Sequence, residues 1–160
     1  MTHAQKWISV ITMRTERTGS GPSLELNLKT LPAPDVAATV RSLLGLRLPL
    51  WNVADSTADD IMLVATELVA NACEATPSAE IAFRARLDTD NVWIGVWDSS
   101  PAMPRPQVRE LALADIDAAA DDQFGGWGLA LVTAVAAERG IQRTPGGKWV
   151  FAAFHIRQSR

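Results

Sequence analysis

Alternating hydrophobic and polar residues predict the strands of this protein. Leu24, Leu26 and Leu28 alternate with polar residues, so one face of that segment is apolar. The segment 92–98 is instead apolar on both faces, which is typical of a central strand. A Pro-Gly-Gly turn at 145–147 joins the last two apolar segments into a hairpin. The predicted strands are 23–29, 79–87, 92–98, 141–144 and 148–156.

Apolar residues that recur every three or four positions predict the helices. Gly45 is expected to end the first helix and Gly140 the third, because glycine commonly follows the last helical turn. Ser56 and Asp59 have the spacing of a capping box at the start of the second helix. The predicted helices are 32–45, 56–75 and 125–140.

The order of these elements predicts an α/β fold of the α+β kind, a two-layer sandwich. Strands joined by tight turns, such as 88–91, pair antiparallel. We therefore expect a mixed, largely antiparallel sheet with the helices on one face. Residues 1–22 are expected to form a flexible tail and 23–160 a single domain. The stretch 99–123 is long for a connection inside a compact domain, and such stretches often carry function.

The composition fits a globular protein and argues against several classes of function. The chain has 160 residues, of which 48% are hydrophobic and 21% charged. A net charge of −3 is not that of a basic nucleic-acid-binding protein. Cys73 is the only cysteine, which excludes an internal disulfide and a cysteine-rich zinc site. No apolar run approaches the roughly 20 residues that cross a membrane, and no secretion signal is evident, so we expect a cytoplasmic protein.

Glu67 and Asn71 lie four residues apart on the second predicted helix and therefore share one face. That face borders the apolar stripe through Leu68. One interpretation is an ordinary solvent-exposed helix face. The other is a metal-nucleotide site, in which the Asn oxygen binds Mg²⁺ and the carboxylate orients or deprotonates a nucleophile.

Two further motifs have both a structural and a chemical interpretation. Asp98 ends the apolar strand and either forms a turn or accepts a hydrogen bond from a buried amine, such as that of adenine. Gly126, Trp127 and Gly128 precede a predicted helix. Glycines there either form a flexible hinge or let the backbone approach a phosphate at the helix N-terminus. Trp127 either packs in the core or lies over a nucleotide.

Taken in order, these motifs resemble the GHKL (histidine kinase-like) ATPase superfamily. Within it, the small anti-sigma-factor serine/threonine kinases are the most similar group. The motifs that carry the resemblance are ELVANA, VWDSSPAMP, GGWGLALV and GGKWVFAAF, and it covers about residues 23–156. It implies ATP and Mg²⁺ as cofactors, with a mobile lid over the nucleotide at roughly 100–125.

The resemblance also implies a role for individual residues. Glu67 would be the catalytic carboxylate, Asn71 the Mg²⁺ ligand and Asp98 the adenine-binding residue. The remaining nucleotide-binding positions would be Gly126, Trp127, Gly128, Leu129 and Lys148.

The implied activity is transfer of the ATP γ-phosphoryl group to a serine or threonine of a partner protein. The partner would be an anti-sigma-factor antagonist or a sigma factor, with no nucleic acid or membrane involved, and the family is consistent with a homodimer. One departure is that Asp98 is followed by Ser99, Ser100 and Pro101, where the family has Asp-x-Gly-x-Gly. Two alternatives therefore stay open: a non-catalytic ATP-binding or partner-binding regulator, and the detached catalytic domain of a histidine kinase.

Overall fold

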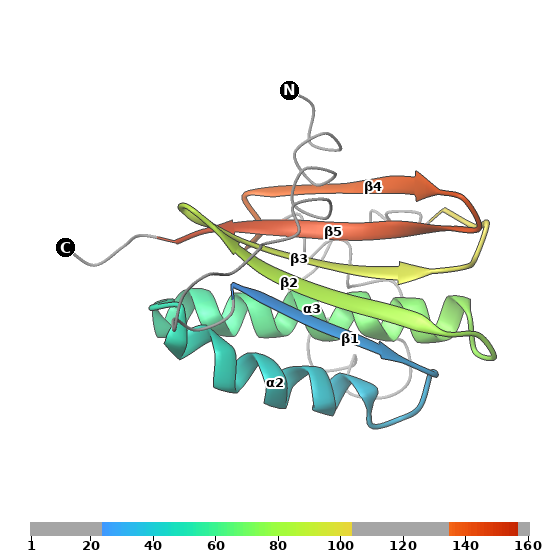
Figure 1. Ribbon diagram of the computed structural model, residues 1–160, viewed down its shortest axis with the longest axis horizontal. Helices are drawn as coiled ribbons and strands as arrows, with labels where there is room; N and C mark the ends of the chain where they lie inside the picture. The colour runs from blue at the N-terminus through green and yellow to red at the C-terminus, as the bar shows by residue number, and fades with distance from the viewer. Residues whose placement is uncertain (1–23, 104–134, 157–160) are drawn as a thin grey trace, which may run out of the picture.

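The computed structural model of the protein describes residues 24–103 and 135–156, which form one antiparallel sheet and two helices (Figure 1). The sheet has the strand order β1-β2-β3-β5-β4, and every neighbouring pair is antiparallel. No parallel pair occurs among these described strands, where the sequence predicted a mixed sheet. The elements are β1 (Glu25–Thr30), α2 (Val36–Leu50), α3 (Asp55–Ala75), β2 (Ile81–Asp88), β3 (Asn91–Asp98), β4 (Glu138–Thr144) and β5 (Gly147–His155).

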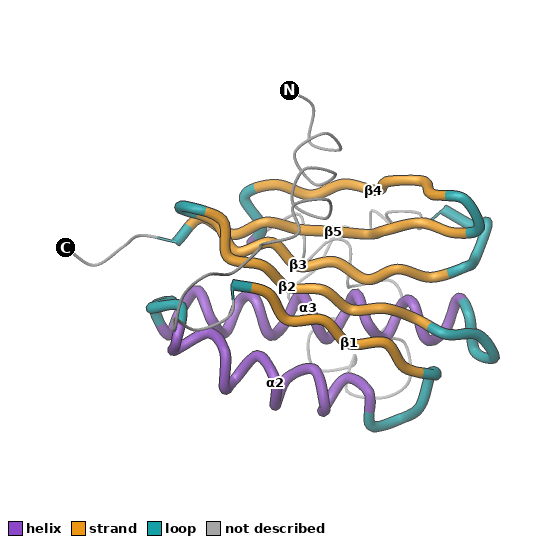
Figure 2. Tube along the Cα trace, in the orientation of Figure 1, coloured by secondary structure: helices purple, strands orange, loops and turns teal. Residues whose placement is uncertain are grey.

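Both helices lie on one face of the sheet and form the second layer (Figure 2). Helix α3 contacts β2, β3 and β5, whereas α2 contacts α3 and β1. Ile94 and Val96 of β3 join Leu68 of α3 in the core between the two layers. The predicted two-layer α+β fold is confirmed.

Helix α3 follows the apolar periodicity of its sequence. Ile61, Val64, Leu68 and Ala72 recur at helical spacing, and all four are buried. Cys73 is partly buried and packs against the same core. No helix in the described ranges is long and apolar enough to cross a membrane.

The predicted cap of α3 is wrong. The N-cap position is Ala54, and it makes no side-chain capping hydrogen bond. Ser56 therefore lies inside the helix, which begins at Asp55. The acidic Asp55 in the first turn still suits the positive end of the helix dipole.

Helix α2 continues past Gly45, where the sequence predicted its end. Leu44 and Leu48 lie one turn apart and are both completely buried, so packing of the second leucine outweighs the low helix propensity of glycine. The helix ends at Leu50, and Trp51 is its C-cap. Asn52 then adopts a left-handed conformation with φ of 55°, a common way to end a helix.

Gly140 was predicted to end a helix, but it lies inside β4 and pairs with Phe151 of β5. A Cβ atom on Gly140 would come 2.6 Å from Cζ of Phe151, so the glycine makes room for this ring. The predicted hairpin of β4 and β5 is confirmed, with its turn at Pro145 and Gly146. Most of the predicted helix 125–140 and of the predicted lid lies outside the described residues, as does the predicted tail.

The sheet face opposite the helices carries a second apolar cluster. It consists of Trp93, Phe151 and Ala153, and Trp149 packs against it. The rings of Trp93 and Phe151 have centroids 6.1 Å apart. Strand β3 is thus buried on both faces, as its uninterrupted apolar sequence predicted.

Candidate functional site

Helix α3 carries the carboxylate of Glu67 into the interior. The residue is only 7% exposed, and its buried Oε2 atom has no hydrogen-bond partner among residues 24–103 and 135–156. Burial raises the pKa of the Glu67 carboxyl, because a charged carboxylate loses its hydration there. The interpretation of Glu67 as part of a solvent-exposed face is therefore wrong. A buried polar atom without a partner is rare in folded proteins, and a catalytic role is one of its physical explanations.

Asn71 lies one helical turn after Glu67 and is partly buried, whereas Glu74 is exposed. The amide oxygen of Asn71 and the carboxylate of Glu67 are hard oxygen donors of the kind that Mg²⁺ prefers. The Oε2 atom of Glu67, which no described residue bonds, is available to a proton or a ligand on this helix face. Within the described ranges no group of three or more His, Cys, Asp or Glu residues could hold a metal ion. Mg²⁺ at Asn71 would therefore share its coordination with ligand oxygens and water.

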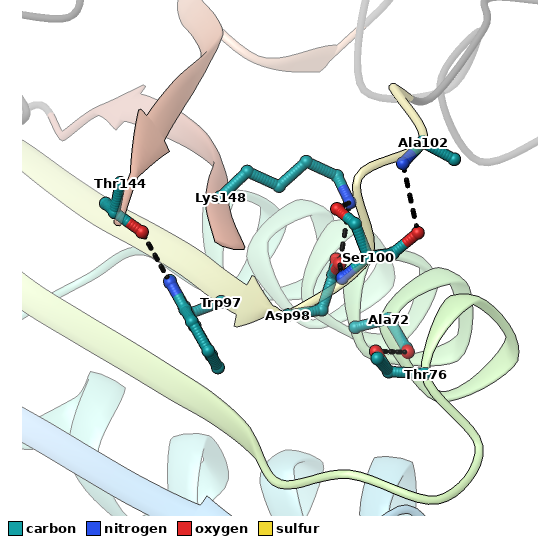
Figure 3. A network of polar contacts seen from close by, with 8 residues as sticks. All are labelled: Ala72, Thr76, Trp97, Asp98, Ser100, Ala102, Thr144 and Lys148. Carbon is teal, nitrogen blue, oxygen red and sulfur yellow. Dashed lines mark hydrogen bonds and ion pairs between the residues drawn. The ribbon is translucent and has the colours of Figure 1, made fainter. Parts of the chain in front are cut away.

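A buried polar network joins the end of β3 to the start of β5 (Figure 3). Asp98 and Lys148 are cross-strand partners, and the Lys148 ammonium lies 2.6 Å from Oδ1 of Asp98. The backbone N–H of Ser100 also donates to Oδ1, at 2.9 Å. Lys148 donates a further hydrogen bond to the carbonyl oxygen of Ser100, at 3.1 Å. We call Asp98, Ser100 and Lys148 the Asp98 network.

The Asp98 network lies on the sheet face that the helices cover. Side chains alternate along a strand, so Asp98 shares its face of β3 with Val96 and Ile94, which pack in the core. Lys148 likewise shares a face of β5 with Ala152. Because α3 packs on this face, the network and Glu67 belong to the same layer between helix and sheet.

The start of β5 approaches β3 closely at the network. A Cβ atom on Gly147 would overlap the carbonyl oxygen of Asp98 and come 2.6 Å from Cε2 of Trp97. Only glycine therefore fits at this position. The Trp97 indole N–H also donates to Oγ1 of Thr144 at 2.8 Å, which fixes the other end of the hairpin turn against β3.

The structure brings together only part of the predicted site. Glu67 and Asn71 share one helix face, and Asp98 and Lys148 form an ion pair. Gly126, Trp127, Gly128 and Leu129 lie outside the described residues and remain predictions. The ion pair itself was not foreseen, because it depends on the register between two strands whose paired residues are 50 positions apart. The available signal was a lone Asp at the end of one apolar strand and a lone Lys at the start of another.

Residues 30–154 match the model of a protein family described as the histidine kinase-like ATPase domain. The chain belongs to this family. The superfamily resemblance drawn from the motifs is confirmed, and membership of an ATPase family implies that the ligand of the domain is ATP. No curated protein matches the chain significantly.

Two solved structures share the fold of this histidine kinase-like ATPase domain. One contains the RsbU and RsbW domains of Rv1364c from Mycobacterium tuberculosis, with 24% identity and a TM-score of 0.60 over 84% of this chain and 32% of that one. The present chain thus spans about a third of that polypeptide. The other is the SiaB-SiaC complex from Pseudomonas aeruginosa, with 15% identity and a TM-score of 0.54 over 82% of this chain and 89% of that one.

Proposed function

We propose that the protein binds ATP with Mg²⁺ and transfers the γ-phosphoryl group to a serine or threonine of a partner protein. The observation that carries this proposal is Glu67, which lies one helical turn before Asn71. Its buried Oε2 has no hydrogen-bond partner in the part of the chain that the structure describes. A carboxylate with a purely structural role would have its hydrogen bonds satisfied. The family supplies the nucleotide on which such a carboxylate would act.

Each residue of the proposed site has a distinct task. Asn71 would hold Mg²⁺, which neutralises phosphate charge when bound. Asp98 would accept a hydrogen bond from the amino group of adenine. By resemblance, the phosphate-binding turn would be formed by 126–129.

The proposed reaction is an in-line displacement at phosphorus. The acceptor hydroxyl oxygen forms a bond to the γ-phosphorus, the bond to the bridging oxygen breaks, and ADP leaves. The hydroxyl proton passes to the carboxylate of Glu67. The raised pKa of Glu67 makes its ionised form a stronger base than an exposed glutamate, which favours this proton transfer.

The proposed partner is a protein of the anti-sigma-factor antagonist class, or a sigma factor, and the proposed location is the cytoplasm. The likeness to a structure in which SiaB is in complex with SiaC supports a protein partner. A homodimer belongs to the same proposal, since the resembling family is consistent with it.

A non-catalytic regulator is the second candidate. The observation that favours it is that Oδ1 of Asp98 is already bound by Lys148 and Ser100. In addition, the serines and proline after Asp98 replace glycines of the family motif. This candidate would bind ATP or its partner without transferring phosphate.

The test is phosphoryl transfer from radiolabelled ATP to a panel of purified anti-sigma-factor antagonist proteins from the same organism. We expect the wild type to label one of them. Glu67→Gln should bind ATP normally but transfer at least about 100-fold more slowly, the usual cost of losing a general base. Glu74→Gln, an exposed change on the same helix, should transfer at the wild-type rate. ATP binding by the wild type with no labelling of any partner would favour the non-catalytic regulator.

A further inference from the structure

The Lys148 ammonium is buried and paired with Asp98. A lysine that follows a Gly-Gly pair near a nucleotide would ordinarily be assigned to the phosphates, as a positive point charge. Instead, the side chain of Lys148 is 4% exposed and its ammonium lies 2.6 Å from Oδ1 of Asp98. Lys148 therefore belongs to the part of the proposed site that would recognise the base.

The hydrogen bonds of the pair leave one donor and one acceptor unused. A lysine ammonium has three N–H donors, and Lys148 gives two of them to Oδ1 of Asp98 and the carbonyl oxygen of Ser100. No described residue accepts the third. Oδ1 of Asp98 accepts from Lys148 and from the N–H of Ser100, and no described residue donates to Oδ2. The pair can therefore bind a ligand that offers an acceptor to Lys148 and a donor to Asp98.

We propose that Lys148 is a specificity-determining residue that reads the adenine base together with Asp98. Oδ2 of Asp98 accepts a hydrogen bond from the exocyclic amino group, and the third N–H of Lys148 donates to the adjacent ring nitrogen N1. The base edge of adenine carries this donor and this acceptor side by side. This inference rests on the proposed function, because it assumes that ATP is the ligand.

The ion pair stays intact when the base binds in this way. The base uses Oδ2, while Lys148 and the N–H of Ser100 hold Oδ1 and so fix the orientation of the carboxylate. Lys148 also compensates the buried negative charge of Asp98, which otherwise would be strongly disfavoured. A purely structural ion pair would provide this compensation without touching the base, so the test must separate the two roles.

The test compares ATP with two analogues by calorimetric titration. 1-Deaza-ATP replaces ring nitrogen N1 by a C–H group and removes the acceptor for Lys148. Purine riboside triphosphate lacks the amino group and removes the donor for Asp98. We expect the wild type to bind each analogue roughly tenfold more weakly than ATP, the effect of one hydrogen bond to a charged group.

The decisive variant is Lys148→Met, which keeps the length of the side chain and removes its donors. We expect it to bind ATP and 1-deaza-ATP equally but to keep its preference for ATP over purine riboside triphosphate. The readout is a ratio of affinities, so a general weakening of binding does not affect it. Arg143→Met, which removes an exposed cation from the cross-strand partner of Lys148, should keep both wild-type ratios.

Three outcomes would overturn the inference, and they have different meanings. A Lys148→Met protein that still prefers ATP over 1-deaza-ATP would show that Lys148 does not touch the base. If the wild type binds ATP and 1-deaza-ATP equally, Lys148 does not donate to N1 of the base. This result needs no variant, so it stands even if Lys148→Met fails to fold. A wild type that binds no ATP at all would overturn the proposed function and this inference with it.

Discussion

At the scale of single residues, two polar arrangements that cost stability lie where the chemistry is proposed. Glu67 keeps a buried carboxylate oxygen that no described residue bonds, and Asp98 and Lys148 bury two charges in one pair. Neither arrangement is expected to improve the free energy of folding, because burying polar or charged groups costs hydration. For Glu67 this cost has a measurable consequence, because a neutral replacement of an unpaired buried carboxylate is expected to stabilise the protein.

Glu67→Gln is therefore expected to raise the stability of the protein at neutral pH. The folded state holds the Glu67 proton to a higher pH than the unfolded state does, since burial raises its pKa from 4.5. The free energy of unfolding of the wild type should thus fall as the pH rises above about 4.5 and through the folded-state pKa, relative to the variant. We expect a gain of about 1 kcal/mol at neutral pH, or about 2–4 °C in Tm.

Thermal unfolding across this pH range measures the effect, with Glu74→Gln as the exposed control on the same helix. The gap between Glu67→Gln and the wild type should close below pH 4.5, where both folded and unfolded wild-type carboxyls are protonated. Curves that run parallel at all pH values would contradict the assignment of Glu67 as a desolvated carboxylate.

Breaking the Asp98–Lys148 pair from one side should destabilise the protein strongly. Asp98→Asn leaves the Lys148 ammonium buried without its counter-charge, which typically costs about 3–5 kcal/mol. The double variant Asp98→Asn with Lys148→Met should recover most of this loss, because no unpaired charge remains. Urea unfolding measures all three proteins, and an Asp98→Asn variant as stable as the wild type would show that the pair is not buried in solution.

At the scale of elements, the sequence predicted a helix or strand correctly where a local pattern determines it. The prediction failed where packing against distant residues determines it. Alternation along β1 and β2, and the continuous apolar run of β3, located these strands because burial follows side-chain direction. The end of α2 was missed because the buried contacts of Leu48 carry the helix past Gly45. Gly140 was misassigned because its partner Phe151, whose ring requires a glycine there, is distant in the sequence.

Two glycines offer a matched contrast between local propensity and close packing. Gly147→Ala would place a methyl group against the carbonyl oxygen of Asp98, so we expect a loss of about 1–3 kcal/mol and weaker ATP binding. Gly45→Ala meets only Cε of Met62 at 3.6 Å, an ordinary contact in an exposed part of α2. It should stabilise the protein by about 0.5–1 kcal/mol without affecting ATP binding.

Urea unfolding and calorimetric titration of both glycine variants check this contrast. If Gly147→Ala were as stable as the wild type and bound ATP equally well, the hairpin of β4 and β5 would not be held against β3 as described.

At the scale of the whole molecule, the two-layer arrangement explains why distant residues can serve one site. Helix α3 packs on β3 and β5, so its polar face and the Asp98 network share the layer between them. The sequence supplied Glu67, Asn71 and Asp98 as separate candidates. Their grouping could be inferred from family resemblance, but the pairing of Asp98 with Lys148 required the strand register.

The central claim is that this layer binds ATP through Mg²⁺ at Asn71, and calorimetric titration with ATP tests it most directly. We predict that the wild type binds ATP at least about tenfold more tightly with Mg²⁺ than in the presence of a chelator, a difference of about 1.4 kcal/mol. Asn71→Ala should lose this dependence on Mg²⁺. Absence of binding by the wild type at millimolar ATP, or equal Mg²⁺ dependence in the wild type and Asn71→Ala, would contradict the account.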